Sequence, residues 1–368
     1  MKMADYNFGA GPSVVPQEVL EVIKREIMNF NHTGLSILET SHRSLDFQAL
    51  ISEAKNDLRA LMGIPADYEI LFLQGGASTQ FMMLPLNLAQ NKTAYYAISG
   101  IFGKKAYEEA VKASQLENID VVSLGSTAHH HYDRLLKIDL EKIDFQKAAY
   151  LHLTTNNTVE GTAIFPENLP ESHEVPLIAD MSSNIMAVDY DISKFGMVYA
   201  GAQKNLGIAG LTVVIIKKDL LSKDQVLPSM LDYQVLAEHQ SMYNTPPTFA
   251  IYVAGLIFKW VKAQGGVKEL ERQNRKKAKL LYDYIDQSDF YDNPVYNINE
   301  RSICNVIFRC PHQNLDVEFA NEAEKRGLLA LKGHRSVGGL RASLYNAFPI
   351  EGVRKLIEFM KDFEEENK

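Results

Sequence analysis

The chain has 368 residues, of which 46% are hydrophobic and 23% charged, as in an ordinary globular enzyme. A length of this order predicts two domains. The net charge of −8 argues against nucleic acid or an anionic membrane as the main partner, so an anionic ligand would need a local cluster of positive groups. No stretch approaches the ~18 consecutive apolar residues of a membrane span.

The chain contains two cysteines, Cys304 and Cys310. Their spacing matches neither a CxxC redox pair nor a zinc site, and two free thiols suit a reducing compartment. The N-terminal sequence "MKMADYNFGAGPSVVP" has no apolar core of the kind found in signal peptides. We therefore expect a cytoplasmic protein.

The first half of the chain predicts two amphipathic helices followed by alternating strands and helices. Residues 16–30 and 47–65 have helical spacing of apolar residues, and Gly63 and Pro65 end the second helix in the expected order. Short apolar strands are then expected at 68–74, 93–99, 148–154, 175–180, 198–203 and 210–218, with helical patterns after the first two. This alternation predicts an α/β fold with a mainly parallel sheet covered by helices, whose ligands bind beyond the carboxyl ends of the strands.

The last hundred residues have a different pattern. Residues 259–288 predict a long charged helix interrupted at Gly265–Gly266, and a strand at 304–310 and helices at 316–328 and 351–366 follow. We therefore expect a large domain over 1–258 and a smaller α+β domain over 259–368, with the N-terminal segment 1–15 packing on the small domain.

Three groups of residues follow expected strands and could carry chemistry. In "LFLQGGASTQF", Gly75–Thr79 lead from a strand into a helix, which suits phosphate binding at a helix N-terminus but equally a plain N-cap. Asp180 ends the apolar strand of "VPLIADMSSN" and could face a ligand or cap a turn. Lys204 lies among small residues in "YAGAQKNLGIAG", where partial enclosure would lower its pKa and make it a nucleophilic amine.

These three groups suit one cofactor. Pyridoxal phosphate needs an amine for its aldehyde, a carboxylate facing its pyridine nitrogen, and a phosphate cradle. Lys204, Asp180 and the Gly75–Thr79 turn would supply them in that order.

The motifs "GGASTQF", "YAGAQKN", "SHRS", "MYNTPPTFA" and "KGHRSVGGLRASLYNA" resemble the phosphoserine aminotransferase family, class V aminotransferases of fold type I. The resemblance extends over almost the whole chain. It implies catalytic roles for Lys204, which would bind the cofactor and move a proton, and for Asp180. It further implies that the cofactor is bound by Ala77, Ser78, Phe102, Thr158, Asp180, Gln203, Lys204, Asn244 and Thr245.

The resemblance also implies the reaction and the assembly. Glutamate would donate its amino group to 3-phosphohydroxypyruvate by a ping-pong mechanism in serine synthesis, and the same site would serve a phosphorylated hydroxythreonine in pyridoxine synthesis. The substrate carboxylates and phosphate would be bound by His42, Arg43, His334, Arg335 and Arg341. Asn244 and Thr245 would reach the neighbouring subunit's cofactor, which implies a homodimer with shared sites. Some relatives have Gly-Arg in place of Ala77-Ser78, so phosphate contacts are expected to be distributed differently here.

Alternative interpretations stay open from the residues alone. Arg43 could simply pair with Asp46, and "YNTPPTFA" alone would read as a turn fixed by prolines.

Another class V enzyme, such as a serine–glyoxylate aminotransferase or a cysteine desulfurase, is the nearest alternative function. A nicotinamide-dependent oxidoreductase would need a glycine fingerprint that the chain does not have, and a non-catalytic binding module would not explain the clustered cations. Three consecutive histidines, His129–His131, do not suit a metal site, and none is expected.

Overall fold

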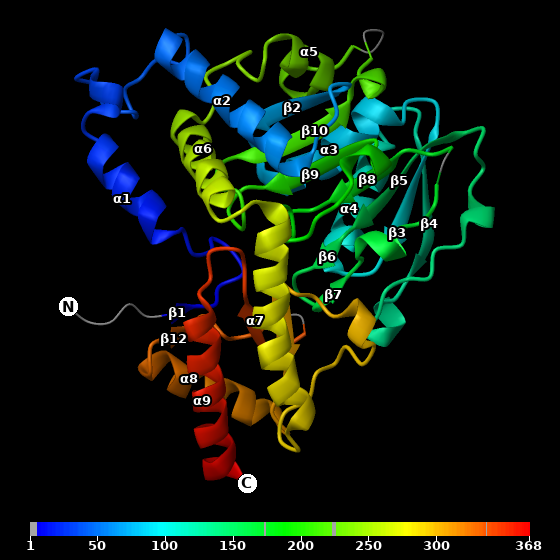
Figure 1. The fold of residues 1–368 in the computed structure, drawn as a ribbon. Helices are drawn as coiled ribbons and strands as arrows, with labels where there is room; N and C mark the ends of the chain where they lie inside the picture. The colour runs from blue at the N-terminus through cyan, green and yellow to red at the C-terminus, as the bar shows by residue number, and fades with distance from the viewer. Residues whose placement is uncertain (1–5, 173, 223–225, 336) are drawn as a thin grey trace.

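The computed structural model describes residues 6–172, 174–222, 226–335 and 337–368. Its centre is a seven-stranded sheet in the order β2-β10-β9-β8-β5-β3-β4 (Figure 1). The strands are β2 Tyr68–Leu73, β3 Thr93–Ile98, β4 Asp120–Ser126, β5 Ala148–Thr154, β8 Leu177–Asp180, β9 Met197–Gly201 and β10 Thr212–Lys217. Only β10 runs antiparallel to its neighbours, β2 and β9, so the expected mainly parallel sheet is confirmed.

Helices cover both faces of this sheet because its strands are apolar on both sides. Alternate residues of β2 show the division: Ile70 and Phe72 belong to the core beneath α2 and α6, whereas Leu71 and Leu73 belong to the core beneath α3 and α4. The helices of the large sheet and its flank are α1 Gln17–Glu26, α2 Leu45–Met62, α3 Gly76–Leu88, α4 Ile101–Ala113, α5 Tyr233–Glu238 and α6 Thr248–Ala263. Among the described residues, no helix combines the length and apolar character that crossing a membrane would need.

The C-terminal part packs beside the sheet as a separate layer of helices and short strands (Figure 1). Its elements are α7 Val267–Gln287, β11 Asn305–Phe308, α8 Gln313–Lys325, β12 Leu328–Leu329, β13 Leu340–Ser343 and α9 Ile350–Asn367. Gly265 and Gly266 both have positive φ, which separates α6 from α7 at the expected break. The domain boundary stays a prediction, and residue 258 lies inside α6.

The first described strand pairs with a strand of the C-terminal part. β1, Tyr6–Asn7, pairs in parallel with β12, so the start of the described part of the expected 1–15 segment contacts the C-terminal elements. Ser13 contacts the large part instead, because its N–H donates to the Gln203 carbonyl at 2.9 Å. Residues 1–5 of that segment lie outside the described residues.

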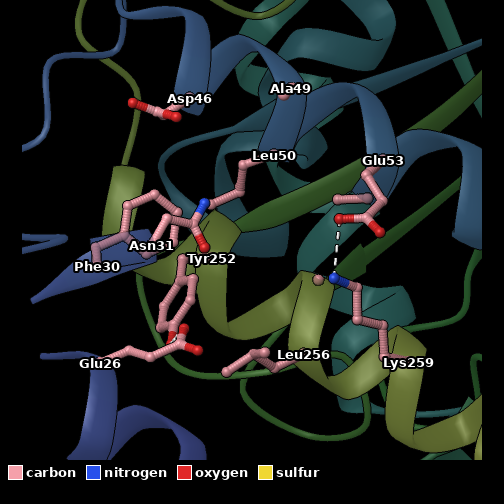
Figure 2. Close-up of a pocket in the computed structure, with 12 residues that line it drawn as sticks. Glu26, Phe30, Asn31, Asp46, Ala49, Leu50, Glu53, Tyr252, Leu256 and Lys259 are labelled. Carbon is pink, nitrogen blue, oxygen red and sulfur yellow. Dashed lines mark hydrogen bonds and ion pairs between the residues drawn. The ribbon is translucent and has the colours of Figure 1, made fainter. Parts of the chain in front are cut away.

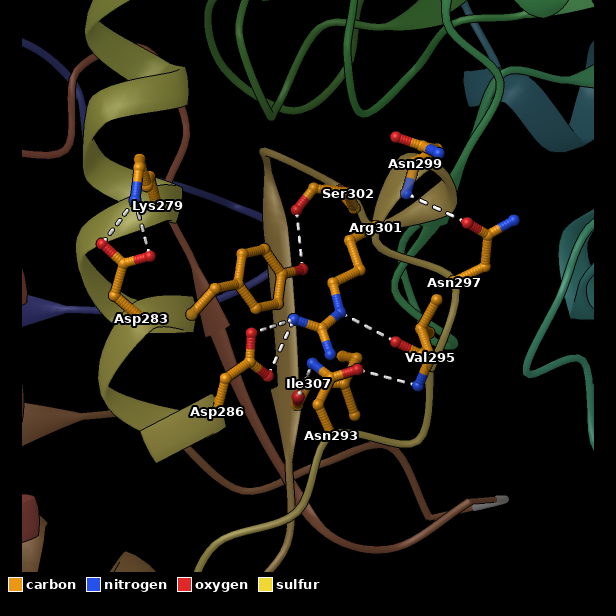
Figure 3. A network of polar contacts seen from close by, with 11 residues as sticks. Lys279, Asp283, Asp286, Asn293, Val295, Asn297, Asn299, Arg301, Ser302 and Ile307 are labelled. Carbon is orange, nitrogen blue, oxygen red and sulfur yellow. Dashed lines mark hydrogen bonds and ion pairs between the residues drawn. The ribbon is translucent and has the colours of Figure 1, made fainter. Parts of the chain in front are cut away.

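A network of polar contacts stabilises the segment that joins α7 to β11 (Figure 3). Arg301 pairs with Asp286 at 2.6 Å and donates through Nε to the Val295 carbonyl at 2.8 Å. The Tyr282 hydroxyl donates to the Ser302 carbonyl at 2.8 Å, and the Ser302 hydroxyl donates to Asn156 Oδ1 at 2.5 Å. Asn156 begins the short hairpin of β6, Asn156–Asn157, and β7, Thr162–Ala163. The C-terminal part is therefore hydrogen-bonded to the β6–β7 hairpin, which follows β5.

Candidate active site

The polar residues singled out in the sequence lie at one edge of the sheet. β9, β8, β5 and β3 are mutually parallel, and β2 points the same way because β10 is antiparallel to both of its neighbours. Asp180 is the last residue of β8, and Lys204 follows β9 after two intervening residues. Thr158 follows β5 and β6, and α3 and α4 begin just after β2 and β3. The carboxyl ends of the strands thus gather the candidate residues, as expected for such a sheet.

Lys204 is surrounded by predicted site residues. Its Nζ donates to Thr158 Oγ1 at 3.0 Å and lies 5.6 Å from the centroid of the Phe102 ring. Burial lowers the pKa of Lys204 to about 8; the charge of Asp180 opposes this shift, and the charge of Arg341 adds to it. A lysine that is more often neutral near physiological pH is a better nucleophile.

Asp180 is a buried carboxylate with few partners of its own. It is 5% exposed, and its Oδ1 accepts the Ser182 backbone N–H at 2.9 Å. Burial raises the pKa of Asp180 above its ordinary value, while the hydrogen bonds from Ser182 and the charge of Lys204 act in the opposite direction. A cationic N–H placed beside it would stabilise the ionised form.

The start of α3 is open for an anion. Gly75 precedes the helix with φ +97°, and a Cβ there would lie 2.1 Å from Thr79 Oγ1, so the turn requires glycine. The first backbone N–H groups of α3, including those of Ala77 and Ser78, are those that a helix leaves without intrahelical acceptors. Ser78 is exposed, and Gln203 is partly exposed next to Lys204.

Positive groups gather around Arg341, which lies on β13. Arg341 Nε is buried and has no acceptor among the described residues. Burial lowers the pKa of His334, and the charges of Arg341, Lys105 and Arg335 lower it further, so these side chains share one region. Sequence reasoning missed Lys105, an exposed residue of α4 whose Nζ lies 5.3 Å from the Phe102 ring centroid.

A second residue that sequence reasoning missed is Glu160. It is 5% exposed, and its Oε1 accepts the Ile101 N–H at 2.8 Å. Its only sequence signal is an acidic residue two positions after Thr158, inside the buried stretch "NNTVEGTAI".

Four predicted residues are not brought to Lys204 within one chain. Among the described residues, neither His42 nor Arg43 makes a hydrogen bond or an ion pair to Lys204 or to the candidate residues around it. Arg43 is exposed in the segment before α2. Asn244 and Thr245 are also exposed, and the Thr245 carbonyl accepts from Gln74 Nε2 at 3.1 Å, just before the α3 turn.

Two other features lie outside the site. The rings of His129 and His130 are tilted by 47° with centroids 4.0 Å apart, and no group of three or more metal-ligating side chains occurs in the described part of the chain. A cavity of about 350 Å³ lies between α1, α2 and α6 (Figure 2). It is lined by residues such as Glu26 and Glu53, whose carboxylates accept from Tyr252 and Lys259 at 2.8 Å, and by no predicted site residue.

Comparisons with known proteins agree with this geometry. The model of the family "Aminotransferase class-V" matches residues 5–356. The phosphoserine aminotransferase of Lactococcus lactis subsp. cremoris (strain SK11) is 67% identical over 363 residues, which cover 99% of this chain and 100% of that protein.

Two solved structures are similar over nearly their whole length. The phosphoserine aminotransferase of Bacillus circulans subsp. alkalophilus is 44% identical, with a TM-score of 0.93 and 99% of each chain covered. The phosphoserine aminotransferase of Trichomonas vaginalis, solved with pyridoxal phosphate bound, is 37% identical, with a TM-score of 0.90 and coverage of 97% of this chain and 99% of that one.

Proposed function

Because the chain belongs to the phosphoserine aminotransferases of the class V aminotransferase family, we infer that it transfers the amino group of glutamate to 3-phosphohydroxypyruvate. The products are 2-oxoglutarate and O-phospho-L-serine, so the reaction belongs to serine synthesis. The observation that carries this conclusion is the position of Lys204, which contacts Thr158 and faces Phe102, Asp180 and Arg341 at the carboxyl edge of the sheet.

The residues at this edge fit pyridoxal phosphate. Asp180 would hold the ring nitrogen and its proton, Phe102 would stack on the ring, and Thr158 would face the ring hydroxyl. Ala77, Ser78 and Gln203 would hold the phosphate at the start of α3. The buried Arg341 Nε, which has no acceptor among the described residues, supports the proposal that this site receives a further polar group. Bound there, pyridoxal phosphate supplies a carbonyl that accepts the substrate nitrogen and a ring that delocalises electrons released at Cα.

The chain's own residues would then direct the reaction. Arg341 would bind the substrate α-carboxylate through its guanidinium and so orient Cα. Lys204, with a pKa lowered to about 8, would take the proton from Cα and return it as a general base and acid. Asp180, buried and anionic beside a cation, would keep a positive charge on the far side of the ring.

The cations near Arg341 would recognise the second anionic group of each substrate. His334 and Arg335 would contact the phosphate of the keto acid or the distal carboxylate of glutamate. The same contacts would suit a phosphorylated hydroxythreonine, so we also propose a part in pyridoxine synthesis.

We further propose that the active protein is a cytoplasmic homodimer. Large apolar side chains are exposed between α1 and α2, including Met28 at 78% and Leu38 at 60%, and at the first residue of α2, Leu45, at 83%. A second copy would cover such a surface, and His42, Arg43, Asn244 and Thr245 would then complete the partner's site. The mass in solution tests this directly, because a monomer of 41.4 kDa would contradict it.

Reaction with one amino acid at a time tests the proposed substrate. We expect O-phospho-L-serine to convert the cofactor-loaded protein to its amine form about tenfold to a hundredfold faster than L-serine, because a charge-assisted hydrogen bond contributes about 1.5–3 kcal/mol. Arg335→Ala should reduce this preference, whereas Arg341→Ala should slow both amino acids. Equal rates with serine and phosphoserine in the unaltered protein would contradict the assignment.

A further inference from the structure

Helix α4, which carries Phe102, begins without a capping side chain of its own. Its N-cap residue is Gly100, and no side chain of that residue can accept the N–H groups of the first turn. The Ile101 N–H is instead accepted by Glu160 Oε1 at 2.8 Å, from a hairpin 59 residues further along the chain. The carboxylate also faces the positive end of the helix dipole.

A capping side chain at the N-cap position itself would not fit, because Gly100 has no room for a Cβ. A Cβ on Gly100 would lie 2.3 Å from Asn157 Oδ1 and 2.9 Å from Glu160 Oε2. The backbone there is extended, so the constraint is steric and not conformational. The space that a Ser or Asp cap would fill is therefore occupied by the two side chains from the hairpin.

The same hairpin carries Thr158, the residue that contacts Lys204. The hairpin is held by backbone bonds between β6 and β7, by the Gly161 N–H to the Asn157 carbonyl at 2.8 Å, and by Asn157 Nδ2 to Thr162 Oγ1 at 2.9 Å. Glu160 thus connects a fixed hairpin on one side of Lys204 with the start of the helix that presents Phe102.

Where the hairpin meets the start of α4, two buried acceptor atoms, Glu160 Oε2 and Asn157 Oδ1, have no donor among the described residues. They approach the same point beside Gly100, and a proton on Oε2 would give Asn157 a donor. Burial raises the pKa of Glu160 to about 7, and backbone N–H groups and the charge of Arg341 act in the opposite direction. Glu160 also lines a cavity together with the titratable side chains of His130, His131, Asp133, Asp292 and Arg309.

We propose that Glu160 is a positioning residue that caps α4 from the Thr158 hairpin and so holds the Phe102 ring in place beside Lys204. This inference rests on the proposed function, since the ring is the surface on which the cofactor would stack. Glu160 itself need not touch the cofactor or the substrate.

The test compares three variants with the unaltered full chain, each freed of cofactor and titrated with pyridoxal phosphate. In Glu160→Ala we expect the Kd for the cofactor to rise about fivefold, which corresponds to ~1 kcal/mol, as for loss of a helix cap. In Glu160→Gln the amide oxygen still accepts from Ile101 and the amide N–H₂ can donate to Asn157, so Kd should stay within about twofold. Glu167→Ala, an exposed acid seven residues further on, is the matched control.

A double-mutant cycle separates positioning from general destabilisation. If Glu160 acts through Phe102, the effect of Glu160→Ala on Kd should fall below about twofold in a Phe102→Ala background. The circular dichroism of the bound cofactor, which reports the asymmetry around its ring, should change in Glu160→Ala and be restored in Glu160→Gln. An unchanged Kd in Glu160→Ala, or an equal effect with and without Phe102, would overturn the inference. The unaltered protein's reaction with phosphoserine, measured in parallel, shows separately whether the proposed function holds.

Discussion

At the scale of single residues, several buried polar atoms of the candidate site and its surroundings have no hydrogen-bond partner among the described residues. Arg341 Nε, Asn157 Oδ1, Glu160 Oε2 and Thr154 Oγ1 all lack a hydrogen-bond partner among the described residues. Such atoms are rare in folded proteins because each costs free energy when it is desolvated and unpaired. The charge of Arg341 acts on both Glu160 and Lys204, so its unpaired Nε lies beside the proposed cofactor site. Glu160 Oε2 and Asn157 Oδ1 instead lie together beside Gly100, at the start of α4.

The pKa of Lys204 provides a residue-scale prediction. The amine is neutral above its pKa, so its reactivity should rise with pH and reach a plateau above about 8, well below the ordinary value of 10.5. Competitive labelling of the cofactor-free protein with a small amine-reactive reagent, read by peptide mass spectrometry, would measure this midpoint.

Lys112 serves as the control within the same digest. Its pairing with Glu109 raises its pKa above 10.5, so it should react only at higher pH. A midpoint for Lys204 near that of Lys112 would contradict the view that burial makes this amine nucleophilic.

At the scale of elements, the site depends on how α3 and α4 begin. Both helices follow strands of the sheet, and both start at glycines because other groups fill the adjacent space: Thr79 beside Gly75, and Asn157 with Glu160 beside Gly100. The first glycine precedes the backbone N–H groups that we propose bind the cofactor phosphate, whereas the second makes room for a cap from another segment. Small residues at these two positions therefore serve different purposes.

Gly100→Ala tests the packing at the start of α4. We expect a loss of about 1–3 kcal/mol in the free energy of unfolding, because the added methyl group overlaps Asn157 and Glu160. The midpoint of urea unfolding, followed by the fluorescence of the single tryptophan, Trp260, would report it.

Gly255→Ala is the matched control for that substitution. A Cβ at this position in α6 would lie 3.6 Å from Ala54 Cβ, an ordinary contact, so the protein should gain roughly 0.5–1 kcal/mol from the lower flexibility of the unfolded chain. Equal effects of the two substitutions would contradict the steric argument for Gly100.

At the scale of the whole molecule, hydrogen bonds between buried side chains join the C-terminal part to the sheet. Asn156 Nδ2 donates to Ser183 Oγ at 2.7 Å, after β8, and to Asn305 Oδ1 at 2.8 Å, on β11. The Asn346 N–H, three residues beyond β13, donates to Asn205 Oδ1 at 3.1 Å, next to Lys204. Within the C-terminal part, Lys277 of α7 donates to the carbonyls of Tyr345 and Phe348 at 2.7 and 3.0 Å. Arg341 on β13 is thereby held in a fixed relation to Lys204 and Asp180, which follow strands of the large sheet.

Much of this molecule could be predicted from the sequence because local patterns determine it. Helical spacing located α2 and α7, Gly63 and Gly265–Gly266 marked helix ends, and apolar runs located β2, β5 and β8. Lys204 was singled out because small residues surround it, and Asp180 because it ends an apolar strand; their charges act on each other in the structure, while their roles stay a proposal. The role of Glu160 and the nearness of Lys105 to His334 could not be predicted, since contacts between segments far apart in the chain leave no periodicity.

The measurement that tests the central claim most directly is the location of the covalent link to the cofactor. The protein purified with pyridoxal phosphate would be reduced with borohydride, digested, and mapped by peptide mass spectrometry. We expect the reduced cofactor on the peptide that contains Lys204 and on no other lysine. A cofactor fixed to a different lysine, or a protein that binds none while Lys204 stays unmodified, would contradict the claim.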